Sequence, residues 1–214
     1  MIGKKTKLVA WFVSNCNTPS QREKLVAELK KHVSVDVYGK CGNWQCEKSC
    51  DEVQILKQYK FYLSFENSVC RDYITEKFYK RLTQDIVPIV LGGAGNYDGT
   101  NQEHLPPGGF VLLTNFSSVK HLADYLLFLD AHPDEYAKYF QWKQNYDIKS
   151  YDPRHIGYCR LCRRLVSIGK HSEERKSFYH DINFWWHKKY ECDNTLVARF
   201  LNNTIPLNDS DNFN

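Results

Sequence analysis

Short apolar runs alternate with longer amphipathic stretches along the first 150 or so residues of the chain. The apolar runs are four to six residues long and rich in β-branched and aromatic side chains, which predicts buried strands. These strands are expected over residues 8–13, 33–38, 61–65, 86–91 and 110–113. Helices are expected over 19–31, 72–82, 118–129 and 133–144, the first with Thr18 as N-cap and Pro19 at its first position.

Strands that alternate with helices predict an α/β fold, here a Rossmann-like doubly wound parallel sheet that binds its ligands at the carboxyl ends of the strands. The chain contains no internal repeat. Beyond Tyr151 it becomes polar, aromatic and less regular. We therefore expect one sheet domain over residues 1–150 and a C-terminal extension over residues 151–214.

Composition narrows the class of ligand. The 214 residues are 42% hydrophobic, and 29 basic against 25 acidic residues give a net charge of +4. This mild and scattered excess suits an anionic small molecule and argues against nucleic acid, whose binders concentrate basic residues on one face. No apolar run approaches the ~20 residues that a membrane span needs, and the N-terminus lacks the order of regions of a signal peptide.

Residues 61–77 carry the clearest chemical signal. An apolar strand leads through the polar turn at Glu66 into a helix expected to begin near Asp72, which is where α/β proteins bind phosphates. On that helix Tyr73, Glu76 and Lys77 would share one face. A cation and a phenol there can hold a diphosphate while the carboxylate accepts from ribose hydroxyls, which predicts a sugar-nucleotide site.

The same segment resembles the signature of the α-1,3-fucosyltransferase family, which is of the glycosyltransferase family 10 type. Its residues FYLSFENS, followed by DYITEK, match the family pattern F-x-x-x-F-E-N-S and D-Y-[IV]-T-E-K. Three neighbouring segments resemble the family in the same order: LVAWFVSNC, VDVYG and PIVLG. The similarity runs from about Lys7 to about Trp186.

The resemblance implies roles for four residues of this segment. Lys77 would contact the phosphates of GDP-fucose and Glu76 the donor hydroxyls, while Asn67 and Tyr73 would complete the donor pocket. The alternative for Glu76 and Lys77 is an ordinary solvated helix face. The domain over residues 1–150 would then be the GDP-fucose-binding half of a two-domain GT-B glycosyltransferase.

Two further donor-binding candidates follow the first strand. Arg22 lies in the first turns of the helix expected after Pro19, where a guanidinium can bind phosphate, and its spacing resembles that of the family's second phosphate-binding base. The alternative is a solvated surface arginine. Ser14 ends the first strand and is a candidate nucleotide contact; the alternative is a structural serine, which is the commoner case at a strand end.

The resemblance also implies the reaction. Fucose would pass with inversion from GDP-fucose to a GlcNAc of a glycoprotein glycan, with no cofactor and no metal, in the Golgi lumen. No catalytic residue is expected in this chain, because the family's base lies in an N-terminal acceptor domain that precedes the similarity, as does the membrane anchor. The second hypothesis is a truncated donor domain that binds GDP-fucose without transferring fucose.

Eight cysteines and three N-glycosylation sequons favour a secretory compartment, so we expect the chain to lack its own N-terminal portion. Local disulfides are expected, without a pairing, among Cys41, Cys46, Cys50 and Cys70. For Cys159 and Cys162, half of a zinc site and a redox pair both fit the spacing poorly. In the family such a pair bonds elsewhere in the enzyme; here the two would pair with each other or stay unpaired.

Three weaker features point to structure rather than chemistry. The glycines at 92, 93 and 95 do not match a phosphate-binding spacing and are expected in a turn. Residues 184–186 are expected to anchor the tail through their aromatic rings, with a sugar-stacking platform as the alternative. Residues 209–211 resemble the D-x-D of metal-dependent transferases but lie in a polar tail, so no metal is assigned to them.

Overall fold

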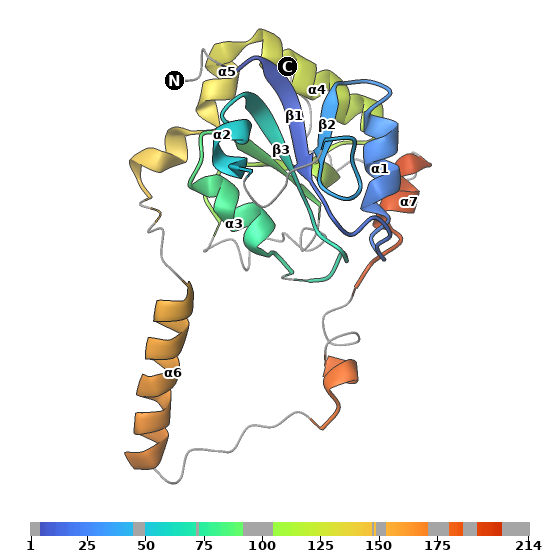
Figure 1. The fold of residues 1–214 in the computed structure, drawn as a ribbon. Helices are drawn as coiled ribbons and strands as arrows, with labels where there is room; N and C mark the ends of the chain where they lie inside the picture. The colour runs from blue at the N-terminus through green and yellow to red at the C-terminus, as the bar shows by residue number, and fades with distance from the viewer. Residues whose placement is uncertain are drawn as a thin grey trace.

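The computed structural model describes residues 5–44, 50–71, 73–91, 105–146, 148, 153–170, 180–185 and 192–202. Within these residues the centre is a five-stranded parallel sheet with strand order β2-β1-β3-β4-β5 (Figure 1). The strands are β1 (Lys7–Phe12), β2 (Val35–Tyr38), β3 (Tyr59–Phe65), β4 (Val87–Leu91) and β5 (Val111–Leu112). Each overlaps an expected apolar run, and the predicted α/β parallel sheet is confirmed.

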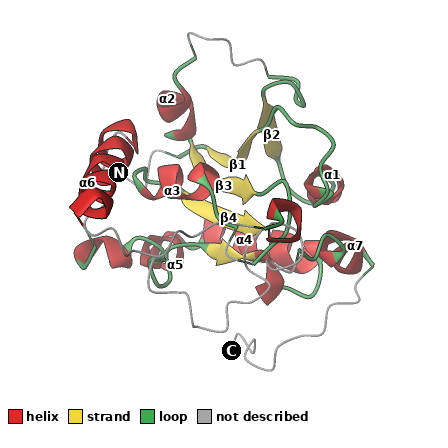
Figure 2. Cartoon of the chain, turned by 90° about the horizontal axis from the view of Figure 1, so that it is seen from below, coloured by secondary structure: helices red, strands yellow, loops and turns green. Residues whose placement is uncertain are grey.

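Helices cover both faces of the sheet, which is why its central strands are apolar on both sides. One face packs against α1 (Arg22–Leu29), α4 (Val119–Ala131), α5 (Pro133–Lys138) and α7 (Leu196–Leu201). The other face packs against α2 (Glu52–Leu56), α3 (Glu76–Leu82) and the 3₁₀ turn η5 (Gln141–Gln144). A further 3₁₀ turn, η4 (Leu113–Asn115), follows β5. Figure 2 shows the sheet between these two layers.

Helix α1 begins later than the sequence predicts. The segment from Thr18 to Gln21 forms a turn, and Gln21 precedes the helix with a left-handed φ of 54°. Two hydrogen bonds hold this turn against the end of β3, because Ser20 donates from its hydroxyl to the Glu66 carbonyl (2.8 Å) and from its amide to the Asn67 carbonyl (2.9 Å). The expected helix start at Pro19 was therefore wrong, since tertiary hydrogen bonds override the local signal.

Helix α3 also begins later, at Glu76 rather than near Asp72. Thr75 is its N-cap, in an extended conformation, and accepts a hydrogen bond from the amide of Lys77. Tyr73 therefore precedes the helix, so the expectation that it shares a helical face with Glu76 and Lys77 was wrong.

The region after residue 151 is more regular than its composition predicts. Helix α6 (Pro153–Lys170) has 18 residues and lies apart from the sheet in Figure 1. All side chains from 157 to 166 are exposed, including the apolar Tyr158, Leu161 and Leu165, which recur at helical spacing. The apolar residues of this helix are interrupted by arginines, so the helix was not expected from the sequence.

Two disulfides within the described residues connect segments that are not neighbours in the sequence. Cys41 pairs with Cys16, and Cys70 pairs with Cys192 across 122 residues. The expectation of local disulfides among Cys41, Cys46, Cys50 and Cys70 was therefore wrong for Cys41 and Cys70, because both bond outside this set. Cys50 is also disulfide-bonded, whereas Cys46 lies outside the described residues. Cys159 and Cys162 are free and exposed on α6, so the alternative of a disulfide between them was wrong and the unpaired alternative is the one that the structure has.

Helix α7 belongs to the main core although it lies far from the sheet in sequence. Leu196, Val197 and Phe200 are buried in the same cluster as the apolar residues of α1 and α4, and α7 packs directly against α1. Phe184, in contrast, is 61% exposed, so this side chain does not provide the aromatic anchor that was expected from residues 184–186. The domain boundary at residue 150 stays a prediction.

We expect Phe200→Ala to lower the free energy of unfolding by about 3–5 kcal/mol, because Phe200 is fully buried and its loss leaves a cavity. Phe184→Ala is the matched control and should change it by less than about 0.5 kcal/mol. Urea unfolding of the oxidised chain measures both. Equal, small effects would show that α7 is not part of the folded core.

Candidate functional site

The candidate site lies where the strand order reverses. The chain runs from β1 outward to β2 and then returns to β3 on the other side of β1, so the carboxyl ends of β1 and β3 form the switch point where such sheets bind ligands. Close packing at this edge requires Gly39, which has a φ of 92° and whose position would place a Cβ 2.6 Å from the Val13 carbonyl oxygen.

A buried carboxylate organises the end of β3. The Glu66 side chain is 2% exposed, and its Oε1 accepts hydrogen bonds from the amide (2.8 Å) and the hydroxyl (2.7 Å) of Thr75. Its Oε2 accepts from the ammonium of Lys77 at 2.9 Å. The carboxylate is thereby fully compensated, as a buried charge must be.

Lys77 makes two more contacts through its ammonium. Nζ donates to the Thr75 hydroxyl at 2.9 Å and lies 3.5 Å from Oε1 of Glu76. The Lys77 side chain is 25% exposed and that of Glu76 62%, so the cation faces solvent on the side of Glu76. Burial raises the pKa of the Glu76 carboxyl, but its own backbone amide and the Lys77 ammonium outweigh this and hold the pKa below its ordinary value.

Arg22 reaches the same place from α1. Its side chain is buried, stacked over the Trp11 ring at 5.6 Å, and donates through Nη1 to the Phe65 carbonyl and through Nη2 to the Asn15 carbonyl. Burial lowers the pKa of the guanidinium, and the nearby Glu66 carboxylate opposes that shift. The alternative of a solvated surface arginine is therefore wrong.

The other candidates follow the carboxyl ends of β1 and β3. Tyr73 lies close enough to Arg22 for an electrostatic interaction between their side chains, and Ser14 is exposed after the end of β1. Among the described residues, three buried side-chain polar atoms have no hydrogen-bond partner: Oδ1 of Asn67 and Nε of Arg22 among the candidates, and Nε of Arg81. Unpaired buried donors and acceptors are costly and often mark a site that a ligand or water completes.

Glu66 and Thr75 are contacts that the sequence analysis missed. Glu66 was expected only as part of a polar turn, although a glutamate directly after a buried strand and nine residues before a threonine N-cap was a usable signal. The distance across the turn could not be inferred, because it depends on where α3 begins.

Some expectations fall outside what the structure describes. The glycines at 92, 93 and 95 and the tail at 209–211 are outside the described residues. Within the described ranges, no three His, Cys, Asp or Glu side chains gather as metal ligands, and metal independence stays a prediction. No helix in those ranges is long and apolar enough to cross a membrane.

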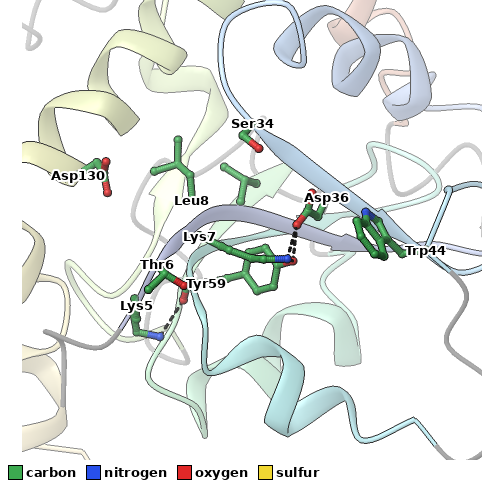
Figure 3. A pocket seen from close by; sticks show the side chains of 10 residues that line it. Lys5, Thr6, Lys7, Leu8, Ser34, Asp36, Trp44, Tyr59 and Asp130 are labelled. Atoms are coloured by element: carbon green, nitrogen blue, oxygen red, sulfur yellow. Dashed lines mark hydrogen bonds and ion pairs between the residues drawn. The ribbon is translucent and has the colours of Figure 1, made fainter.

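A separate cavity lies at the other end of the strands from the candidate site, near the amino ends of β1, β2 and β3. It has a volume of about 580 Å³, and Figure 3 shows Lys7, Asp36 and Tyr59 together on one wall. Oδ2 of Asp36 accepts from the Lys7 ammonium (2.9 Å) and from the Tyr59 hydroxyl. The Lys7 ammonium, the Asp36 carboxylate and the Tyr59 hydroxyl are already paired with one another, so we do not include this cavity in the candidate site.

The fold and the cluster define the class first. This is a Rossmann-like α/β protein with two cations and a buried carboxylate gathered at the switch point, where proteins of this class bind their ligands. The chain belongs to glycosyltransferase family 10, the fucosyltransferases, because the model described as "Glycosyltransferase family 10 (fucosyltransferase) C-term" matches residues 2–185. The resemblance found in residues 61–77 is thus confirmed.

Curated relatives agree. The chain is 42% identical over 187 residues to alpha-(1,3)-fucosyltransferase C of Drosophila melanogaster, covering 85% of this chain and 41% of that protein. It is 38% identical over 215 residues to glycoprotein 3-alpha-L-fucosyltransferase A of the same organism, covering 96% of this chain and 40% of that protein. The chain therefore spans about two fifths of the length of these relatives.

Solved structures show the same fold. An α1,3-fucosyltransferase determined with GDP superposes with a TM-score of 0.55 at 26% identity, covering 64% of this chain and 38% of that one. Another, determined with GDP-fucose, gives a TM-score of 0.61 at 23% identity, covering 83% of this chain and 50% of that one.

The Asp36 contacts predict a pH dependence of stability. Burial alone would raise the pKa of Asp36, but hydrogen bonds from Tyr59 and Lys7 bring it below its ordinary value. The ionised group therefore stabilises the fold above the unfolded pKa of about 3.9, and this contribution is lost as the pH falls through the lower folded pKa.

Asp36→Asn should lower the free energy of unfolding by about 1–2 kcal/mol at pH 7, and the difference from the unsubstituted protein should shrink below about pH 4. Urea unfolding across a pH series measures it. Asp124→Asn, which removes an exposed ion pair with Lys120, is the control and should have little effect. A difference that stays constant down to pH 2 would contradict the assignment.

Proposed function

We propose that this chain binds GDP-fucose at the switch point and supplies the donor-binding half of an α-1,3-fucosyltransferase. The observation that carries the proposal is the convergence of Lys77 and Arg22 on one buried carboxylate, Glu66, beside an exposed Glu76. Family membership and the solved relatives determined with GDP and GDP-fucose support the choice of ligand.

The roles follow from charge and exposure. The Lys77 ammonium faces solvent on one side and would contact the diphosphate, because a cation that is partly shielded from water attracts phosphate strongly. Arg22 is more deeply buried and would act on the diphosphate mainly through its charge, with Nε available as a donor. The ionised Glu76 would accept from donor hydroxyls, and Asn67, Tyr73 and Ser14 would line the remainder of the pocket.

These residues would assist the departure of GDP. In an inverting transfer the acceptor oxygen attacks the anomeric carbon of fucose while the bond from that carbon to the phosphate oxygen breaks. Negative charge then grows on the diphosphate, and positioned cations stabilise it, which is often the largest catalytic contribution. The acceptor proton goes to a base that we do not assign to this chain, in keeping with the family's use of an N-terminal acceptor domain.

The acceptor and the compartment are part of the same proposal. The acceptor would be a GlcNAc of a glycoprotein glycan, and the reaction would take place in the Golgi lumen. The cysteine pairs at Cys16–Cys41 and Cys70–Cys192 support an oxidising compartment, because structural disulfides are rare where thiols are kept reduced.

We expect Lys77→Ala to weaken GDP-fucose binding by about 10- to 100-fold, the amount that one hydrogen bond to a charged group contributes. Calorimetric titration of the oxidised chain measures the dissociation constant. The matched control is Lys80→Ala, which removes an equal charge from an exposed side chain in the last turn of the same helix.

Two outcomes would contradict the proposal. One is a folded chain that shows no saturable binding of GDP-fucose. The other is an equal loss of affinity in the Lys77 and Lys80 variants, which would mean that net charge rather than this site attracts the ligand.

A further inference from the structure

We propose that Glu66 is a positioning residue, which orients the Lys77 ammonium toward the diphosphate through a contact that the ligand does not share. This inference rests on the proposed function. An ammonium has three protons to donate. Two of them go to Glu66 Oε2 and Thr75 Oγ1, both at 2.9 Å, and the third is directed toward Glu76 at the longer distance of 3.5 Å.

The first two partners are fixed in place. Glu66 is buried, and its amide donates to the Leu91 carbonyl of β4 at 2.8 Å, which ties the residue to the sheet. Its Oε1 receives both the amide and the hydroxyl of Thr75. Glu76, by contrast, is mostly exposed. A phosphate oxygen therefore replaces Glu76 as the third partner, while Glu66 and Thr75 keep the other two protons.

The same residue reaches the second cation. The Glu66 carboxylate acts electrostatically on Arg22, whose guanidinium donates to the carbonyl of the preceding residue, Phe65. The Glu66 carbonyl accepts from Ser20, two residues before Arg22. Both cation-bearing segments are thus held by one residue at the end of β3, so neither has to be ordered when the anion binds.

Charge and positioning make opposite predictions for Glu66. The carboxylate is negative and close to the proposed anion, so by Coulomb's law alone its removal should tighten binding. If instead Glu66 holds Lys77 in a productive orientation, its neutralisation should weaken binding, because Lys77 then becomes free to rotate. The direction of the change therefore separates the two explanations.

The experiment is a double-mutant cycle with Glu66→Gln and Lys77→Ala, read out as the dissociation constant of GDP in calorimetry. Glutamine keeps an oxygen for Thr75 but loses the charge that holds the ammonium. We expect Glu66→Gln to weaken GDP binding about tenfold in the native background but not to weaken it when Lys77 is alanine, where only the loss of the negative charge remains. Equal effects in both backgrounds would assign Glu66 a general structural role and overturn the inference.

The possible failures are distinguishable. If Lys77→Ala leaves GDP binding unchanged, the proposed function fails; if Lys77→Ala weakens binding but Glu66→Gln tightens it or leaves it unchanged, only this inference fails. Near-ultraviolet circular dichroism checks that each variant is folded.

If Glu66→Gln does not fold, Thr75→Val and Thr75→Ser decide the question. Valine removes the hydroxyl that contacts both Glu66 and Lys77, whereas serine keeps it. Positioning predicts that the valine variant binds GDP about tenfold more weakly than the serine variant. Equal affinities for the two would overturn the inference.

Discussion

The need to compensate one buried carboxylate shapes the region around the carboxyl end of β3. Glu66 is withdrawn from water at the end of an apolar strand, and an unpaired charge there would cost several kcal/mol. Thr75 and Lys77 satisfy it, and this sets where α3 begins and which way Lys77 points. The three side chains that meet this requirement of stability are also the ones that we propose to hold or position the contact with the diphosphate.

Much of the fold could be read from local patterns. The apolar runs became strands because most of their side chains are buried, on both faces in the central strands β3 and β4, and composition reports burial directly. The first residues of the helices were harder to predict. Thr18 and Pro19 carry a strong local signal, yet hydrogen bonds from Ser20 to the end of β3 delay α1 to Arg22.

The candidate site shows the same limit. Lys77 and Arg22 could be named from residue type and resemblance, but the burial of Arg22 and its proximity to Glu66 depend on strand order. Long-range pairing was equally hidden: nothing in the spacing of the cysteines indicates that Cys70 joins Cys192. Contacts between segments that are distant along the chain are therefore the part of the structure that is hardest to predict from the sequence.

The link between Cys70 and Cys192 has a consequence for how the protein must be made and handled. Beside the disulfide, the Asp193 amide donates to the Val69 carbonyl (2.7 Å), and the Val69 amide donates to Asn194 Oδ1 (3.1 Å). The stretch that follows Asn67 is therefore fastened to the segment that leads into α7. Synthesis must run past residues 192–194 before the loop of the candidate site acquires this support, so a ribosome-bound chain lacking those residues holds the loop only from one side.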